Sequence, residues 1–437
     1  MKLPAVFFTL AFVALSLNTI HAYGAETKNP HTLIVGLDGI SYQTVLKMHQ
    51  SGHFKKFQKP IPMVATFPSI SDPNWAHILR APVENNYTRA GFLMTKNSDG
   101  TIGKEFGTII DHLTKPPQFE KKFDYKAEGF FEHLMTMALS ETSAFLWTES
   151  LLRYLLNPKN LKNKNTTKAF IINTDIISHV GGENKVIEYL KTLDNKIEAL
   201  KVNFKETHGR NLKVVLVSDH GNHFKKPTAI DYKKPLEEKG YFQRSSLKEK
   251  TDYAFVAPEI ISFGAFYTLP GAEASFAKEM ANVKGVHVAL ILNSPNTIHV
   301  FSKSGMSRIN VNPTKKTIAY EVLSGDDPFN HIRYFKNKKQ LTWSEYFKIS
   351  FESDYPNALV RAWEGFYKNA KNPASVLVSA ELGYVFTNMT LQILTAVSGV
   401  QSTHGSFHKE ESFGVIMSTL PPSEEASTSF GFKDLIK

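Results

Sequence analysis

Seven side chains that can bind metal ions or act as nucleophiles are spread over most of the chain, where turns should follow short buried strands. They are Asp38, Ser71, Asp175, His179, Asp219, His220 and His404. Three of the preceding segments, LIVGL, AFII and VVLV, are rich in β-branched residues, the pattern of strands buried on both faces of a parallel sheet. In open α/β sheets the ligand crevice lies beyond the carboxyl ends of the strands. The pattern therefore predicts that residues far apart in the sequence share one site.

These residues belong to five short motifs that follow one another in a fixed order. The motifs are Asp-Gly at 38–39, Ser-x-Pro-Asn at 71–74, Asp-x-x-x-His at 175–179, Ser-Asp-His-Gly at 218–221 and Thr-His-Gly at 403–405. Their order resembles the alkaline phosphatase superfamily, and within it the type I phosphodiesterase and nucleotide pyrophosphatase branch. The resemblance implies an α/β fold, an alkaline phosphatase-like three-layer sandwich with a mostly parallel sheet and an inserted α+β cap.

The resemblance also implies roles for the individual residues. Ser71 would be the nucleophile, and Asn74 would contact a phosphoryl oxygen. Two divalent ions would be bound, one by Asp175, His179 and His404, the other by Asp38, Asp219, His220 and Ser71. Three imidazoles favour zinc over magnesium, which prefers oxygen ligands and retained water, while manganese and iron remain open. The chain has no cysteine, which excludes a thiolate zinc site.

The residue types agree with phosphoryl transfer through a covalent phosphoserine. A serine hydroxyl is a poor nucleophile at neutral pH, and two metal ions about 4 Å apart both activate an attacking oxygen and stabilise a leaving oxygen. Ser71 precedes a predicted helix with Pro73 in its first turn, so free amides should face the phosphate. Thr66 and Ser69 compete for the role of nucleophile. The complete Pro-Asn after Ser71 favours Ser71.

Several alternatives stay open at this point. The enzyme is interpreted as a phosphodiesterase or nucleotide pyrophosphatase, with phosphomonoesterase as the alternative and a non-catalytic binding protein on the same fold as a third, weaker one. A sulfatase is disfavoured because Asn74 stands where that branch has arginine. The expected partner is a small phosphorylated substrate, such as a nucleotide or phosphodiester. His223 and His408 lie close to ligands in the sequence, and either orient them or line the rim.

Composition and the N-terminal segment limit the location and the partners. Residues 1–22 read as a signal peptide, with cleavage as late as 25, and an exported chain of 437 residues without cysteine favours a bacterial periplasm. The net charge of +10 indicates attraction to anions, but no recognised binding module predicts specific nucleic-acid recognition. The apolar run 382–400 is interrupted by Asn388 and Gln392, so we expect no membrane span.

The elements that must position the site follow from the same patterns. We expect core strands near 32–37, 62–66, 168–174 and 212–218, with helices near 41–51, 72–80 and 184–206. These belong to one catalytic domain over 30–437, with an insertion at 82–165 that includes an amphipathic helix. A second insertion at about 240–340 has strands between Gly and Asn-Pro turns, which predicts the cap. Helices near 342–350 and 355–369 then lead back to His404.

Overall fold

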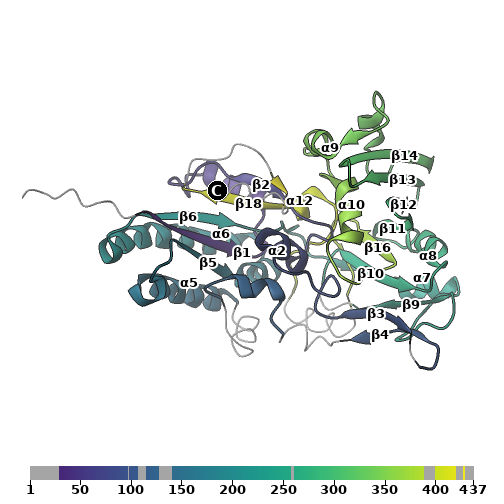
Figure 1. Ribbon diagram of the computed structural model, residues 1–437, viewed down its shortest axis with the longest axis horizontal. Helices are drawn as coiled ribbons and strands as arrows, with labels where there is room; N and C mark the ends of the chain where they lie inside the picture. The colour runs from purple at the N-terminus through teal and green to yellow at the C-terminus, as the bar shows by residue number, and fades with distance from the viewer. Residues whose placement is uncertain are drawn as a thin grey trace, which may run out of the picture.

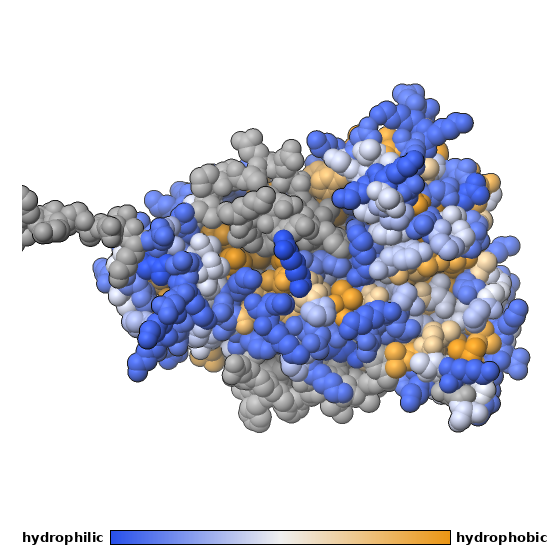
Figure 2. All heavy atoms as spheres, in the orientation of Figure 1, coloured by the Kyte–Doolittle hydropathy of each residue, from blue (hydrophilic) through white to orange (hydrophobic). Residues whose placement is uncertain are grey.

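The computed structural model describes residues 29–96, 98–106, 115–126, 140–256, 260–387, 399–419 and 427–428. Two sheets lie side by side in Figure 1, a six-stranded one on the left and a nine-stranded one on the right. The predicted signal peptide lies outside the described residues. Among the residues that are described, no helix is long and apolar enough to cross a membrane. In Figure 2, hydrophilic side chains predominate on the visible face, and apolar ones appear only in small groups.

The six-stranded sheet has the order β19-β2-β18-β6-β1-β5. Its centre is parallel, because β1 pairs in parallel with both β5 and β6, while β18 runs antiparallel to β6 and β2. The strands are β1 (His31–Leu37), β2 (Ile61–Val64), β5 (Thr166–Ile171), β6 (Leu212–Val217), β18 (Phe413–Ser418) and β19 (Ser427–Thr428). The four predicted strands are all present, and β5 ends earlier than predicted because helix α6 begins at Asn173.

Helices cover both faces of this sheet, which makes three layers. Side chains alternate along β1, so that Leu33 and Val35 face one layer and Ile34 the other. The first layer contains α1 (Tyr42–Gln50), α5 (Ser140–Leu156) and α6 (Asn173–His208), and the second contains α2 (Ser71–Leu79) with the 3-10 helix η1 (Gln118–Lys122). Burial on both faces explains why the strands read as continuous apolar runs in the sequence.

Helix α6 is longer than the predicted helix at 184–206. It begins at Asn173 and continues past a non-helical residue, Gly182, whose φ is 69°. The extra segment before Gly182 carries Asp175 and His179. In the insertion at 82–165, α5 packs on α6, where the hydroxyls of Thr148 and Tyr189 are 3.0 Å apart. Helix α5 forms the second part of the predicted amphipathic stretch, and the first part lies outside the described residues. A short 3-10 helix, η2 (Pro158–Leu161), follows α5.

The nine-stranded sheet has the order β15-β14-β13-β12-β11-β16-β10-β9-β8 and is almost entirely antiparallel. Most of it comes from the predicted cap, but β16 lies between β11 and β10, so the sheet is completed by residues beyond 340. The strands are β8 (Phe242–Gln243), β9 (Asp252–Phe255), β10 (Phe263–Thr268), β11 (Val286–Ser294), β12 (Thr297–Phe301), β13 (Gly305–Asn312), β14 (Thr317–Gly325), β15 (Leu341–Thr342) and β16 (Val376–Ala380).

The remaining elements surround this second sheet. In Figure 1, α10 lies at the junction of the two sheets. The helices are α7 (Lys233–Glu238), α8 (Glu273–Met280), η3 (Ile332–Phe335), α9 (Trp343–Ser350), α10 (Ala358–Tyr367) and α12 (Lys409–Ser412). Two small ribbons complete the described chain: β3 (Gly91–Lys96) with β4 (Ile102–Phe106), and β7 (Thr228–Ala229) with β17 (Tyr384–Val385).

Candidate active site

The candidate site lies at the carboxyl ends of the three parallel strands of the core sheet. Asp38 directly follows β1, Asp219 and His220 follow β6 after one residue, and Asp175 lies in the first turn of α6, just after β5. Because these strands are parallel and adjacent, their ends meet at one edge. His404 reaches the same edge from the loop before α12 and β18.

One group of ligands combines a carboxylate with two imidazoles. His179 lies one helical turn after Asp175, and its Nε2 is 3.2 Å from Asp175 Oδ2. His404 comes from the loop before α12, and its Nε2 lies 3.6 Å from the same oxygen. One donor atom from each of the three residues lies within 4.8 Å of the others, a spacing that one metal ion can span.

The second group combines two carboxylates with one imidazole, and all three side chains are almost completely buried. Asp38, Asp219 and His220 bring donor atoms within 4.8 Å of one another, and His220 Nε2 lies 3.5 Å from Asp219 Oδ2. The two groups are adjacent, because the rings of His220 and His404 stack with their centroids 4.0 Å apart. The fold therefore assembles two neighbouring donor sets.

The three histidines share one orientation. In each ring Nδ1 donates to a backbone carbonyl at 2.9–3.0 Å: Ser402 for His179, Gly221 for His220 and Ser69 for His404. Since a carbonyl can only accept, Nδ1 carries a proton in each ring, and Nε2 is the nitrogen left to bind a metal ion or, without one, a second proton. That nitrogen faces the carboxylates in every case, which is the tautomer and direction that a metal ligand requires.

Electrostatics point to bound cations. Burial, followed by the charges of Asp219 and Asp175, raises the pKa of Asp38 well above its usual value. Burial also raises the pKa of Asp219 to about 8, and its Oδ2 is buried without a hydrogen-bond partner among the described residues. Burial opposes ionisation of Asp175 too, but His179 and His404 outweigh it, and its pKa lies well below the usual value. Two fully buried carboxylates and a partly buried third repel one another at this spacing until positive charge lies between them, so the residues fit two divalent cations.

The hydroxyl of Ser71 lies beside the second donor group, in contact with Asp38 and His220. Its Oγ donates to Asp38 Oδ1 at 3.0 Å and lies 3.4 Å from His220 Nε2. Ser71 is the first residue of α2, so its hydroxyl lies at the positive end of a helix. The competing candidates are elsewhere: Thr66 Oγ1 donates to the carbonyl of Pro68, and Ser69 Oγ donates to that of Ser406. Thr66 and Ser69 are both buried. Of the three candidate nucleophiles, Ser71 is the one whose hydroxyl contacts the candidate metal ligands.

The side chain of Asn74 contacts the backbone of the segment before Ser71. Its Oδ1 accepts from the backbone amide of Thr66 at 2.7 Å, and its Nδ2 donates to the carbonyl of Ile70 at 2.8 Å. The side chain is completely buried. In this structure Asn74 ties the loop before Ser71 to the first turn of α2, and its contact with a phosphoryl oxygen stays a prediction.

Two residues that the sequence did not single out support the ligands directly. Trp75 Nε1 donates to Asp38 Oδ1 at 3.0 Å, on the same oxygen as Ser71. Asn222 Nδ2 donates to Asp175 Oδ1 at 3.1 Å and to the carbonyl of Gly39 at 2.7 Å. Asn222 follows His220 by two residues, so proximity to a ligand was the only available signal. Gly39 is closely packed here, since an added Cβ would lie 2.2 Å from Asp175 Oδ1.

A third residue, Arg361 of α10, joins the loops that carry Ser71 and His404. It is 1% exposed and donates to carbonyls of both loops and to one hydroxyl. The acceptors are the carbonyls of Thr66, Pro356, Ser406 and Phe407 and the hydroxyl of Ser69, at 2.8–3.3 Å. Burial lowers the pKa of Arg361 to about 9, so the guanidinium is still charged at neutral pH.

The other histidines singled out in the sequence have supporting positions. His223 pairs through its backbone with Thr403, at 2.8 and 3.1 Å, and so joins the two ligand loops. His408 is buried beneath the site, and its Nε2 lies 3.8 Å from Glu381. Neither ring belongs to the two donor groups.

No protein-family model and no curated protein matches the sequence, but its structure has relatives. Human ectonucleotide pyrophosphatase/phosphodiesterase 5 superposes with a TM-score of 0.50 at 12% identity, over 92% of this chain and 93% of that one. The fold is alkaline phosphatase-like. The same protein from mouse has a TM-score of 0.47 at 12% identity, over 93% of each chain. Phosphonoacetate hydrolase from Sinorhizobium meliloti has a TM-score of 0.47 at 13% identity, over 93% of this chain and 94% of that one.

The alkaline phosphatase-like fold confirms the architecture that the order of the motifs predicted. At 12% identity the likeness concerns the path of the chain. It assigns no role to the individual residues of the site.

Proposed function

We propose that this protein is an exported hydrolase of phosphoric esters, phosphodiesterase or nucleotide pyrophosphatase in type, that uses two divalent cations and Ser71 as its nucleophile. One observation carries the proposal: Ser71 Oγ lies at hydrogen-bond distance from Asp38, within a cluster that also contains a second complete donor set. An alkaline phosphatase-like fold adds support. Export is proposed from the N-terminal segment, and the absence of cysteine supports a bacterial periplasm.

The ions would be held by the two donor groups already described. Asp175, His179 and His404 would hold one, and Asp38, Asp219 and His220 the other, next to Ser71. Zinc suits the three imidazoles best. When bound, the pair supplies Lewis-acid stabilisation of phosphoryl oxygens and favours ionisation of a nearby hydroxyl.

The residues of this chain hold and orient the reacting hydroxyl. Asp38 accepts from Ser71, and Trp75 donates to the same carboxylate oxygen and so restricts its rotation. The first amides of α2, which have no acceptor within the helix, face a phosphoryl group attached at Ser71. Ser71 Oγ then forms a bond to phosphorus as the ester oxygen leaves. Water cleaves the resulting phosphoserine and restores the hydroxyl.

The decisive experiment is trapping the covalent intermediate. The zinc-loaded chain should turn over p-nitrophenyl phosphate, its bis ester or a nucleotide, and acid quenching followed by peptide mapping should recover phosphate on Ser71. Ser71→Ala should abolish both, whereas Ser324→Ala, at an exposed position on β14, should alter neither. Phosphate on Thr66 or Ser69, or full activity of Ser71→Ala, contradicts the assignment. Preference for the monoester over the bis ester would select the phosphomonoesterase alternative, and bound metal without turnover would select a binding protein.

A further inference from the structure

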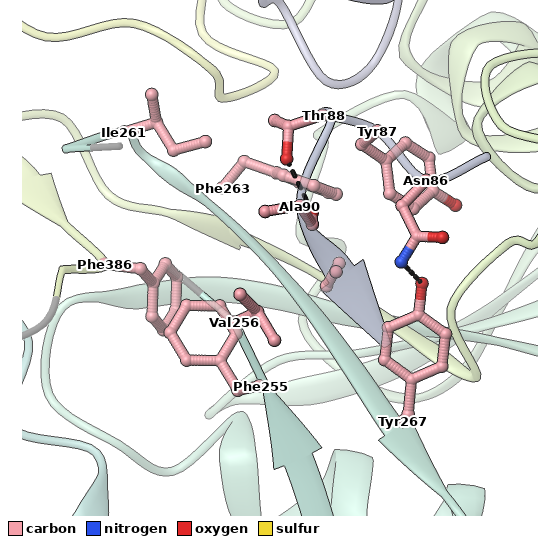
Figure 3. A pocket seen from close by; sticks show the side chains of 12 residues that line it. Asn86, Tyr87, Thr88, Ala90, Phe255, Val256, Ile261, Phe263, Tyr267 and Phe386 are labelled. Carbon is pink, nitrogen blue, oxygen red and sulfur yellow. Dashed lines mark hydrogen bonds between the residues drawn. The ribbon is translucent and has the colours of Figure 1, made fainter. Parts of the chain in front are cut away.

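A hollow lined mainly by rings lies where β3, β9 and β10 meet, and we call it the aromatic pocket (Figure 3). Its cavity volume is about 30 Å³, and the hollow is partly open to solvent. Rings and aliphatic groups from four segments of the chain form its walls, principally Tyr87, Phe255, Ile261, Phe263, Tyr267 and Phe386. No charged side chain is among the lining residues that the structure describes. The pocket is therefore chemically unlike the anionic metal site.

The polar groups that reach the aromatic pocket are already engaged within the protein. Thr88 Oγ1 donates to the carbonyl of Ala90, and Asn86 Nδ2 donates to the hydroxyl of Tyr267, as the dashed lines in Figure 3 show. The hydroxyl of Tyr87 donates to the carbonyl of Gly365, and that of Tyr267 to the carbonyl of Asn372. A ligand in the pocket therefore meets ring faces and methyl groups rather than side-chain donors that need a partner.

One wall of the pocket is attached to the first turn of the nucleophile helix. Arg89 lies between the lining residues Thr88 and Ala90, and its Nη1 is 2.6 Å from Asp72 Oδ1. Asp72 is the residue immediately after Ser71. This ion pair is largely buried, so the pocket wall and the nucleophile are held close together.

A second lining segment, which contacts the first through Tyr87 and Phe263, is joined to the loop of His404. Ser262 lies between the lining residues Ile261 and Phe263, and its amide donates to the carbonyl of His404 at 2.8 Å. The ring of Phe263 also packs edge-on against Phe67, in the loop before Ser71, with centroids 5.3 Å apart. Two lining segments of the aromatic pocket are thus joined by direct contacts to the helix that begins at Ser71 and to the loop of His404.

We propose that the aromatic pocket binds an uncharged hydrocarbon group, alkyl or aryl, of the phosphoester whose phosphoryl group lies at Ser71. The inference rests on the proposed function and names its substrate class. A nucleobase is disfavoured, because its ring donors and acceptors would be desolvated against side chains whose own polar groups are already paired. A hydrocarbon gains from the same environment, by about four-fold in affinity for each methylene group buried, equivalent to ~0.8 kcal/mol.

The test uses substrate-like ligands that are not hydrolysed. Methylphosphonate and butylphosphonate are titrated calorimetrically into the zinc-loaded full-length chain, and the ratio of their dissociation constants measures the contribution of the pocket. Three additional methylenes should make butylphosphonate bind several tens of times more tightly. Ala265→Leu, which fills the pocket, should reduce that ratio to a few-fold without changing the binding of methylphosphonate. Val256→Asp, at a half-buried lining position, should reduce the ratio as well and serves if the first variant folds poorly.

The control is Ala229→Leu at an exposed position on β7, which should keep the wild-type ratio. Equal binding of the two phosphonates, a ratio unaffected by both pocket variants, or a nucleoside monophosphate that binds more tightly than butylphosphonate would overturn the inference. Turnover of p-nitrophenyl phosphate separates it from the proposed function. Turnover without a chain-length preference refutes the pocket alone. A pocket-dependent preference without turnover supports the pocket and refutes the hydrolase.

Discussion

Arg361→Met should destabilise the protein and loosen the His404 side of the active site. Methionine keeps much of the side-chain volume but removes every donor, so five acceptors lose the hydrogen bonds of a buried cation. One of the four carbonyls keeps a hydroxyl partner, because Ser69 Oγ donates to the carbonyl of Ser406 at 2.9 Å. Ser412 Oγ has a single proton and lies closest to the carbonyl of His408, at 2.7 Å. The loss is therefore smaller than the sum of six charged hydrogen bonds. We expect about 3 kcal/mol in the free energy of unfolding.

The catalytic effect should exceed that of a general loss of stability. Arg361 links the loop before Ser71 to Ser406 and Phe407, which closely follow His404. Without this link the two loops can shift relative to each other, and a displacement of about 1 Å costs on the order of 100-fold in turnover. Among the six carboxylate and imidazole donors, His404 is the one that lies beside the linked loops, so one of two zinc equivalents should bind more weakly while the other keeps its affinity.

The assay combines urea denaturation, chelator competition for zinc and steady-state kinetics. Arg361→Lys should recover part of the zinc affinity, because an ammonium reaches some of the same carbonyls. Arg153→Met, at an exposed position on α5, is the matched control and should match the wild type in all three measurements. The reasoning is refuted if Arg361→Met leaves zinc affinity and turnover unchanged, or if it weakens both zinc equivalents equally.

Three further predictions follow from particular contacts. Asn74→Ala should lower the free energy of unfolding by roughly 1–3 kcal/mol in denaturation, because it leaves the Thr66 amide without its acceptor. Unchanged stability with lost turnover would contradict this and support the predicted contact with a phosphoryl oxygen. Gly39→Ala should reduce the zinc content found by elemental analysis, since its φ of 61° is strained for alanine and the Cβ displaces Asp175. His331→Gln should make the free energy of unfolding less sensitive to acid. Burial lowers the pKa of His331 to about 3, so between pH 3 and 6.5 the unfolded chain binds more protons than the folded chain. The stabilisation by His331 is complete above pH 6.5 and is lost as the pH falls, by up to several kcal/mol. Parallel plots of the free energy of unfolding against pH for wild type and variant would contradict this.

The core sheet was predictable because the residue pattern that produces it lies within short stretches of the sequence. Strands β1, β5 and β6 are buried on both faces, so they appear as continuous apolar runs, and polar residues that follow such runs must lie at one edge of a parallel sheet. The boundary of the cap was harder to predict from the sequence. Strand β16 pairs with β10 and β11, which are far away in the sequence, and its own residues carry no sign of these partners.

The sequence by itself therefore determined the alkaline phosphatase-like fold, through the order of its motifs, and the meeting of Asp38, Asp175 and Asp219 at one edge of the sheet, because strand burial and the residues after each strand are local properties. Only the tertiary structure decided how they are supported. It turned Asn74 toward Thr66 and Ile70, brought Arg361 from α10 to the loops of Ser71 and His404, and formed the aromatic pocket from four separate segments. These contacts join residues up to about 300 positions apart, and such pairs are selected by the packing of whole elements, which no local pattern of residue types records.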